Sequence, residues 1–399
     1  MHDYENETVE ETGQSYMYKL RLIDSIPDGL IARLQQPNFE ISQEKETEGI
    51  LVRSSNVPDE AITEELLVIS RSGVGVNTIN LEAATENGTA VLNTPGVNAN
   101  AVKELVLACL FLTVRPVATA AEMVRTLKGP DILGQAESKR SDYVGQELQG
   151  KTIGLLGMGA IGTQIARSCY DLGMEVLGYA RREHDIDYVN QVDLDELLHL
   201  SDFVVVVLPL TNETRDLLTE EKLGQMKKGA YLLNFGRDPI VNSTGLLKVL
   251  QDEIIAGYIT DFPQEEYIGH PNILMLPHIG GTTQEALKGG DRLAVRALRN
   301  FLLFGTVRES VNFPATRLVF QSPYRLTIFY QKTGKTWSKI MNYLDQENLK
   351  IGNMTSNGKD GYDYMLIDLE ESFDRIEPVA KKIQDISSVK RVRILSKPN

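Results

Sequence analysis

The chain has 399 residues, of which 42% are apolar and 24% charged, and it carries a formal net charge of −14. This composition is close to that of ordinary globular chains and excludes a collagen-like, a wholly disordered or a membrane-embedded protein. Its length indicates two or three domains, at about 150 residues per domain. The acidic balance and the lack of an apolar run of roughly 20 residues argue against nucleic acid and against a membrane as partners.

Residues 1–15 form an acidic, polar tail that lacks the basic start and apolar core of a secretory signal. Cys109 and Cys169 lie in predicted helices and form no CxxC pair, which indicates buried free thiols in a reducing cytoplasm. No group of histidines and cysteines in the sequence has the spacing of a metal site, so no metal is expected.

Short apolar runs alternate with helical stretches up to about Thr94 and again from Lys151 onward. The predicted strands cover residues 49–55, 66–70 and 90–93, and then 152–156, 175–179, 203–207, 230–234, 254–259 and 273–276. Such alternation is typical of βαβ units, and continuously apolar strands are typical of parallel sheets covered on both faces. The sequence therefore predicts two doubly wound α/β domains, with a long apolar helix over 101–115 between them.

A different pattern begins after Pro314. The predicted elements are a strand over 324–330, a helix over 335–345, strands over 348–355 and 362–369, a helix over 373–383 and a last strand over 389–395. This βαββαβ order is that of a small, separate ferredoxin-like domain.

A glycine-rich turn, Gly157 to Gly162, follows a predicted strand and opens a helix. The first glycine of such a turn allows the tight bend, the second lets the backbone approach a pyrophosphate, and the third lets helix and strand pack closely. This context predicts a dinucleotide site. The next strand ends in Ala180 and Arg181 instead of the carboxylate that usually holds the ribose of NAD, so the residues leave NAD and NADP open.

Arg237, Glu265 and His278 each stand shortly after a predicted strand, and they are suited to hydride transfer. Neighbouring strands lie about 4.8 Å apart, so the three groups converge if their strands are neighbours. A histidine can take the hydroxyl proton of a substrate, a carboxylate beside it orients the ring, and an arginine grips a substrate carboxylate with two parallel hydrogen bonds. Glu266, next in the chain, is the alternative carboxylate.

A second glycine-rich loop, Arg71 to Asn77, follows the strand over 66–70. Its backbone N–H groups can form an anion cradle, and an ordinary turn is the alternative.

Together these segments resemble the D-isomer-specific 2-hydroxyacid dehydrogenase family. The matching segments are 72–75, 93–96, the glycine turn, 208–211, 234–237 and 277–281, within a resemblance that runs from about Leu51 to Pro314. The C-terminal βαββαβ stretch resembles an ACT domain, a regulatory module that often binds amino acids.

The resemblance implies a discontinuous substrate-binding domain of residues 16–97 and 282–316, a Rossmann nucleotide domain of residues 98–281, and an ACT domain of residues 322–399. It implies NAD-dependent oxidation of a phosphorylated 2-hydroxy acid, 3-phosphoglycerate, to 3-phosphohydroxypyruvate, the first step of L-serine biosynthesis. A homodimer or homotetramer with an interface through the long apolar helix, and an amino-acid effector at the ACT domain, are also expected.

The resemblance also implies residue roles. Arg237, Glu265 and His278 match the catalytic arginine, glutamate and histidine of the family. The implied cofactor contacts are Gly157, Gly159, Ala160, Ile161, Gly162, Ala180, Arg181, Pro209, Phe235, Gly236, Asp261 and Gly280. The implied substrate contacts are Arg53, Ser54, Ser72, Gly73, Val74, Asn98 and Arg140, with Arg53 placed for a phosphate group.

Three departures from the family pattern leave alternatives open. Ala180 replaces the usual aspartate, Thr260-Asp261-Phe262 replaces the usual Asp-Val-Phe, and Leu349-Lys350 stands where serine-binding relatives place an asparagine. The alternatives are NADP as cofactor, and an ACT domain that binds another ligand or only assembles subunits. For the activity, they are another D-2-hydroxyacid dehydrogenase of the glyoxylate/hydroxypyruvate reductase or 2-hydroxyglutarate type, and a nucleotide-sensing protein without turnover.

Overall fold

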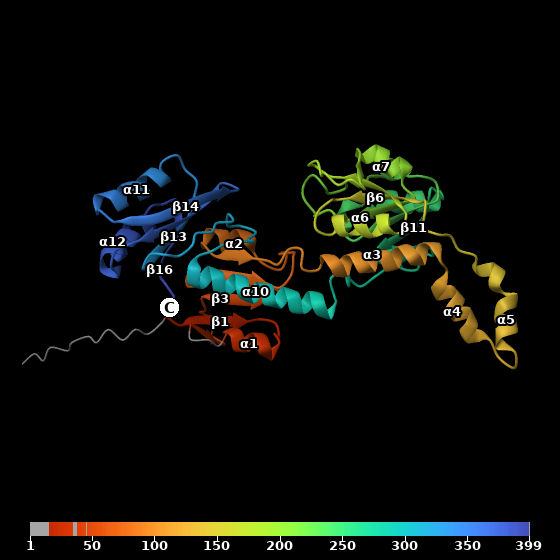
Figure 1. Ribbon diagram of the computed structural model, residues 1–399, viewed down its shortest axis with the longest axis horizontal. Helices are drawn as coiled ribbons and strands as arrows, with labels where there is room; N and C mark the ends of the chain where they lie inside the picture. The colour runs from red at the N-terminus through yellow and green to blue at the C-terminus, as the bar shows by residue number, and fades with distance from the viewer. Residues whose placement is uncertain (1–15, 35–37, 45, 399) are drawn as a thin grey trace, which may run out of the picture. The chain divides into compact units, whose positions relative to one another are not determined.

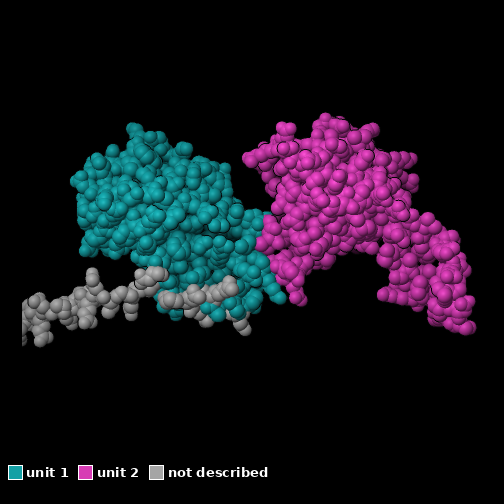
Figure 2. All heavy atoms as spheres, viewed as in Figure 1, with its two compact units in different colours: residues 1–95, 288–399 teal, residues 96–287 magenta. Residues whose placement is uncertain are grey.

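The structure, a computed structural model, describes residues 16–34, 38–44 and 46–398 (Figure 1). The acidic tail predicted over residues 1–15 therefore lies outside the described residues. The chain divides into two compact units: residues 1–95 with 288–399 form unit 1, and residues 96–287 form unit 2 (Figure 2).

Unit 2 contains a seven-stranded parallel sheet in the order β12-β11-β10-β9-β6-β7-β8. Its strands are β6 (Thr152–Leu156), β7 (Glu175–Tyr179), β8 (Asn190–Gln191), β9 (Phe203–Val206), β10 (Ala230–Asn234), β11 (Ile255–Thr260) and β12 (Ile273–Met275). Its main helices are α3 (Ala99–Val114), α6 (Gly162–Asp171), α7 (Leu194–Leu200), α8 (Glu220–Gly224) and α9 (Ser243–Gln251). The predicted doubly wound nucleotide domain is confirmed.

Both faces of this sheet are buried, as its continuously apolar strands predict. Val205 on β9 belongs to a core formed with α3 and α6, whereas its neighbours Val204 and Val206 belong to a core formed with α7, α8 and α9. Because side chains alternate along a strand, one short apolar strand supplies both cores. The free thiols of Cys109 on α3 and Cys169 on α6 are buried in the first core, which confirms the prediction.

Two helices that the sequence did not indicate follow α3. They are α4 (Val117–Thr126) and α5 (Ile132–Ser138), and neither buries a residue. Figure 1 shows them extending away from the sheet of unit 2. Of the helices in the described residues, none alone is long and apolar enough to span a membrane, and only α3 with α4, bent by 63°, meets that length and composition as a pair.

Unit 1 begins with a five-stranded parallel sheet in the order β2-β1-β3-β4-β5. Its strands are β1 (Tyr18–Leu22), β2 (Phe39–Ile41), β3 (Gly49–Val52), β4 (Val68–Arg71) and β5 (Ala90–Leu92). Helices α1 (Asp28–Leu34) and α10 (Gln284–Phe304) pack on one face, and α2 (Leu81–Glu86) packs on the other.

The last elements form an antiparallel sheet in the order β14-β15-β13-β16, which confirms the predicted βαββαβ arrangement. They are β13 (Tyr324–Gln331), α11 (Thr336–Gln346), β14 (Ile351–Lys359), β15 (Tyr362–Leu369), α12 (Phe373–Gln384) and β16 (Val389–Ser396). Helices α11 and α12 cover one face of this C-terminal sheet.

The C-terminal sheet has a core of its own with α11 and α12, and its other face shares a core with the first sheet of unit 1. Its second face presents Phe329 and Tyr364, which pack with Phe301 of α10 and with Phe313. Polar contacts add to this packing, because Arg393 on β16 donates to the carbonyl of Leu302 at 2.7 Å. A change of pattern after Pro314 reveals a new element order, but it does not reveal that the two sheets bury a face together.

Candidate active site

Strands β10, β11 and β12 are neighbours in the sheet of unit 2, so their carboxyl ends lie at one edge. Arg237 follows β10 and precedes a short helix, Glu265 begins a short helix after β11, and His278 follows β12. Because the three strands are neighbours, Arg237, Glu265 and His278 follow strand ends along one edge of the sheet. Ligands of open α/β sheets bind at this edge.

Arg237 is held by the turn that carries it. Its Nη1 donates to the carbonyl of Gly236 at 2.7 Å, and burial lowers the pKa of the guanidinium without removing its charge at neutral pH. The fully buried Asn234 accepts from the Gly236 N–H at 3.1 Å and donates to the Arg237 carbonyl at 3.0 Å. Asn234 is a supporting residue that sequence reasoning missed, although its place at the end of an apolar strand was a signal.

His278 is exposed and has a φ of +58°, a left-handed conformation that is unusual for a residue with a side chain. Such a backbone costs roughly 1–2 kcal/mol and persists only where the surroundings fix it. The ring of Phe262 meets the His278 ring edge-on, with centroids 5.1 Å apart. The imidazole thus packs against one aromatic ring, while the residue as a whole stays exposed.

Asp261, predicted to contact the cofactor, is 3% exposed and turned toward the loop of His278. Its carboxylate oxygens accept the backbone N–H groups of Ile279 and Gly280, each at 2.7 Å. Its neighbour Thr260 is fully buried and accepts the N–H of Phe262 at 3.1 Å.

Glu265 is exposed, and within the described residues no hydrogen bond or ion pair joins it to His278. The contact expected between the two is therefore not formed in this structure. The alternative carboxylate, Glu266, lies close enough to Asp238 to act on it: burial and the charge of Glu266 raise the pKa of Asp238.

The glycine turn has room for a phosphate group. Gly157 has a φ of +112°, and a Cβ on Gly162 would lie 1.9 Å from the Gly157 carbonyl oxygen, so both positions require glycine. A Cβ on Gly159 would meet nothing within 4 Å, so this glycine faces open space at the start of α6. Ala160 is exposed and Ile161 precedes α6, whose first turn has no acidic residue. These residues fit a dinucleotide pyrophosphate.

A carboxylate does stand near the end of β7, although it comes from another segment. Arg181, just beyond Ala180, forms an exposed ion pair with Glu213 at 3.0 Å.

Of the other predicted cofactor contacts, Pro209 is exposed, whereas Phe235 is 6% exposed and its ring belongs to the core with α3 and α6. The ring of Phe235 is therefore a packing group, because an apolar residue after an apolar strand continues the core.

Two predicted substrate contacts, Arg53 and Ser54, lie in unit 1 and are bound to carboxylates of this chain. The Arg53 guanidinium is paired with the buried Asp291 on α10. The backbone N–H groups of Arg53, Ser54 and Ser55 all donate to Oδ2 of Asp24, at 2.5, 3.0 and 3.3 Å. Nothing in the local sequence signals these distant acidic partners.

In the loop predicted as an anion cradle, some backbone N–H groups already donate hydrogen bonds to carbonyl groups of unit 1. The N–H of Ser72 donates to the Val52 carbonyl at 2.8 Å, and that of Gly73 donates to the Arg71 carbonyl at 3.0 Å. The side chain of Val74 is 39% exposed. Of the implied substrate contacts Ser72, Gly73 and Val74, the first two thus use their backbone N–H groups within unit 1.

Two predicted substrate contacts belong to unit 2. Asn98 lies beside the loop of His278, because a Cβ on Gly281 would be 2.9 Å from its Nδ2, and its Oδ1 is a buried acceptor without a partner among the described residues. Arg140 is exposed at the start of a short helix. No group of three His, Cys, Asp or Glu side chains in the described part of the chain could hold a metal ion.

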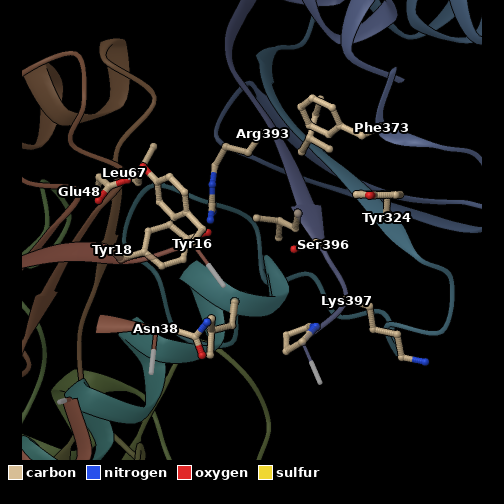
Figure 3. Close-up of a pocket in the computed structure, with 14 residues that line it drawn as sticks. Tyr16, Tyr18, Asn38, Glu48, Leu67, Tyr324, Phe373, Arg393, Ser396 and Lys397 are labelled. Atoms are coloured by element: carbon tan, nitrogen blue, oxygen red, sulfur yellow. Dashed lines mark hydrogen bonds between the residues drawn. The ribbon is translucent and has the colours of Figure 1, made fainter. Parts of the chain in front are cut away.

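A pocket of about 620 Å³ lies in unit 1 between β1 and the C-terminal sheet (Figure 3). Its walls include Tyr16, Tyr18 and Glu48 on one side and Arg393 and Phe373 on the other. The hydroxyl of Tyr18 donates to the carbonyl of Leu302 at 3.0 Å.

The model of the D-isomer specific 2-hydroxyacid dehydrogenase NAD-binding domain matches residues 107–280. The chain is 33% identical over 289 residues to the D-3-phosphoglycerate dehydrogenase of Homo sapiens, covering 68% of this chain and 52% of that protein, so it spans about half the length of this relative. It is 33% identical over 281 residues to the glyoxylate/hydroxypyruvate reductase B of Serratia proteamaculans, covering 67% and 84% of the two chains.

Solved structures agree with these matches. The NAD+-bound 3-phosphoglycerate dehydrogenase of Entamoeba histolytica has a TM-score of 0.61 and 25% identity, over 74% of this chain and 99% of that one. The predicted NAD-type nucleotide domain is confirmed by the family match. The chain therefore belongs to the D-isomer-specific 2-hydroxyacid dehydrogenase family.

Proposed function

We propose that this protein is an NAD-dependent dehydrogenase that oxidises the hydroxyl group of a D-2-hydroxy acid, with 3-phosphoglycerate as its substrate. The observation that carries the proposal is the placement of Arg237, Glu265 and His278 at the carboxyl ends of three adjacent strands, in a sheet that also carries the glycine turn. A histidine, an arginine and a dinucleotide site at one sheet edge are the groups that this oxidation requires.

In the proposed reaction, a ring nitrogen of His278 takes the proton of the substrate hydroxyl. Arg237 binds the substrate carboxylate through parallel hydrogen bonds and holds the reacting carbon in place. Glu265 is assigned to stabilise the imidazolium that results, through a contact with His278 that this structure does not contain. When bound, NAD+ would supply the acceptor for the hydride that leaves the carbon bearing the hydroxyl. The products are a 2-oxo acid and the reduced cofactor.

The glycine turn would hold the pyrophosphate, with Gly159 facing it and the N-terminus of α6 supplying free N–H groups. Glu213 supports NAD over NADP, because a carboxylate paired with Arg181 neutralises the cation that would meet a 2′-phosphate.

The substrate is assigned from the matching relatives named D-3-phosphoglycerate dehydrogenase, and its product would enter L-serine biosynthesis. A second candidate is an unphosphorylated acid, as in the glyoxylate reductases that also match. The ion pair of Arg53 with Asp291 favours this second candidate, because the arginine expected to bind a phosphate already has an anionic partner.

Assembly and regulation complete the proposal. Val117, Val124 and Leu133 on α4 and α5 are 58%, 45% and 70% exposed. These two helices bury no residue within their own chain, so their exposed apolar side chains favour an interface in a homodimer or homotetramer.

We assign the C-terminal sheet to an ACT-type regulatory role because its βαββαβ order fits that module. L-Serine and other amino acids are to be screened for a rise in melting temperature.

The test is reduction of NAD+ by the purified protein with 3-phosphoglycerate, D-glycerate, D-lactate and D-2-hydroxyglutarate. We expect the highest kcat/KM with 3-phosphoglycerate. Higher activity with an unphosphorylated acid would establish the second candidate. Absence of turnover with all four acids, in protein that binds NAD+, would point to a nucleotide-sensing role.

A further inference from the structure

The loop that carries His278 is fixed by a residue that follows a different strand. Asp261 comes directly after β11, and both of its carboxylate oxygens accept backbone N–H groups from residues that come directly after His278. The two distances of 2.7 Å are short for N–H···O bonds, as expected when the acceptor is ionised.

The contact is built into the fold and is not a surface contact. Asp261 is 3% exposed. A Cβ on Gly280 would lie 2.8 Å from its Oδ2, so the glycine allows the carboxylate to approach the backbone. The carboxylate also acts on α3: burial, followed by the charge of Asp261, raises the pKa of Cys109 to about 11.

The conformation that these bonds hold is a strained one. His278 has a φ of +58°, and the two N–H groups bound by Asp261 belong to the next two residues. Phe262, next to Asp261, meets the imidazole edge-on. One dipeptide after β11 therefore fixes both the backbone beside His278 and its ring.

We propose that Asp261 is a positioning residue of the active site: its carboxylate clamps the N–H groups of Ile279 and Gly280 and so keeps the His278 imidazole at the sheet edge where the hydroxyl proton is taken. This inference rests on the proposed function only for its catalytic consequence, because the clamp itself can be measured without substrate.

The first experiment measures amide hydrogen exchange in the full chain and in Asp261→Asn, without ligands. The variant keeps the size of the side chain but places an NH2 group against one of the two donors. A lost charge-assisted bond is expected to speed exchange at Ile279 and Gly280 by about tenfold or more. Unchanged exchange at both amides would overturn the clamp.

The second experiment measures steady-state kinetics with the best substrate. In Asp261→Asn, kcat is expected to fall by about 10- to 100-fold with KM for NAD+ near the wild-type value, because the glycine turn is untouched. The matched control is Asp202→Asn, which removes a carboxylate that accepts the Thr152 N–H at 2.9 Å at the opposite edge of the same sheet. Equal kcat values in wild type and Asp261→Asn would refute the positioning role.

A further variant keeps the inference testable if Asp261→Asn does not fold. Gly280→Ala retains the carboxylate but forces it away from the loop, so it is expected to lower kcat and to speed exchange at Ile279. Wild-type behaviour of Gly280→Ala would refute the clamp. If the wild type oxidises no hydroxy acid, the proposed function fails, while hydrogen exchange still decides whether Asp261 fixes the loop.

Discussion

Arg53 and Asp291 form a two-point ion pair, with Nη2···Oδ2 at 2.6 Å and Nε···Oδ1 at 3.3 Å, although 238 residues separate them in the chain. Asp291 is 1% exposed, whereas Arg53 keeps 28% of its side chain exposed. This relationship bears directly on substrate choice, because Arg53 was expected to bind a phosphate.

Substitution of Arg53 separates the two candidate substrates. In the double variant Arg53→Gln/Asp291→Asn, no charge is left buried without a partner. If the exposed part of the guanidinium binds a phosphate, KM for 3-phosphoglycerate rises by about tenfold or more, and KM for D-glycerate stays the same. Equal effects on both acids, measured by initial rates, would contradict a phosphate contact at Arg53.

Cofactor preference depends on Glu213 in this account. Glu213→Gln removes the partner of Arg181 and leaves a cation near the end of β7. The ratio of kcat/KM for NADP+ to that for NAD+ is expected to rise several-fold, and Arg181→Ala in the same background should reverse the rise. A ratio that does not respond to either change would show that the ion pair lies outside the nucleotide site.

The buried pair of Arg325 and Asp368 is expected to be essential for the stability of unit 1. Both side chains are at most 1% exposed, and Arg325 also donates to the carbonyl of Phe304 at 2.8 Å. Arg325→Met leaves a buried carboxylate without a cation, so unfolding free energy should fall by about 3–5 kcal/mol. Arg167→Met, which breaks an exposed pair with Asp171, should cost under about 0.5 kcal/mol in the same denaturant titration.

Acid should destabilise unit 1 through Asp24. Burial alone would raise the pKa of this carboxyl, but the Ser55 hydroxyl and the backbone N–H groups of residues 53–55 lower it below its usual value. A group with a lowered folded-state pKa stabilises the fold above its unfolded-state pKa of about 3.9, and this contribution is lost as pH falls through the lower folded-state value.

Asp24→Asn should therefore be less stable than wild type at neutral pH and should lose less stability below about pH 4. Urea titrations at several pH values measure both quantities. Parallel pH profiles for the two proteins would contradict this role for Asp24.

Local sequence was sufficient for six of the seven strands of unit 2 and for the residues at their ends, whereas the two-residue strand β8 was not predicted. The glycine turn lies between β6 and α6 as its spacing predicts, and Arg237 and His278 follow β10 and β12, the strands on either side of β11. These features can be predicted from the sequence because each depends on residues within one short segment.

The partners of Arg53 and of the loop that carries His278 were not predictable from the sequence. Asp24 and Asp291 meet Arg53 from distant segments, and Asp261 at the end of β11 meets the loop that follows the neighbouring strand β12. A carboxylate that accepts backbone N–H groups leaves no periodic pattern, since its partners carry no side-chain signature. The absence of a hydrogen bond between Glu265 and His278 among the described residues likewise depends on three-dimensional placement.

The most direct test of the central claim is the rate of NAD+ reduction by His278→Asn with saturating 3-phosphoglycerate, alongside the dissociation constant for NAD+. The account predicts a kcat lowered by about 10²- to 10⁴-fold, the range expected for loss of a general base, with NAD+ binding unchanged. Wild-type kcat in His278→Asn would contradict the assignment of His278 as the residue that takes the substrate proton.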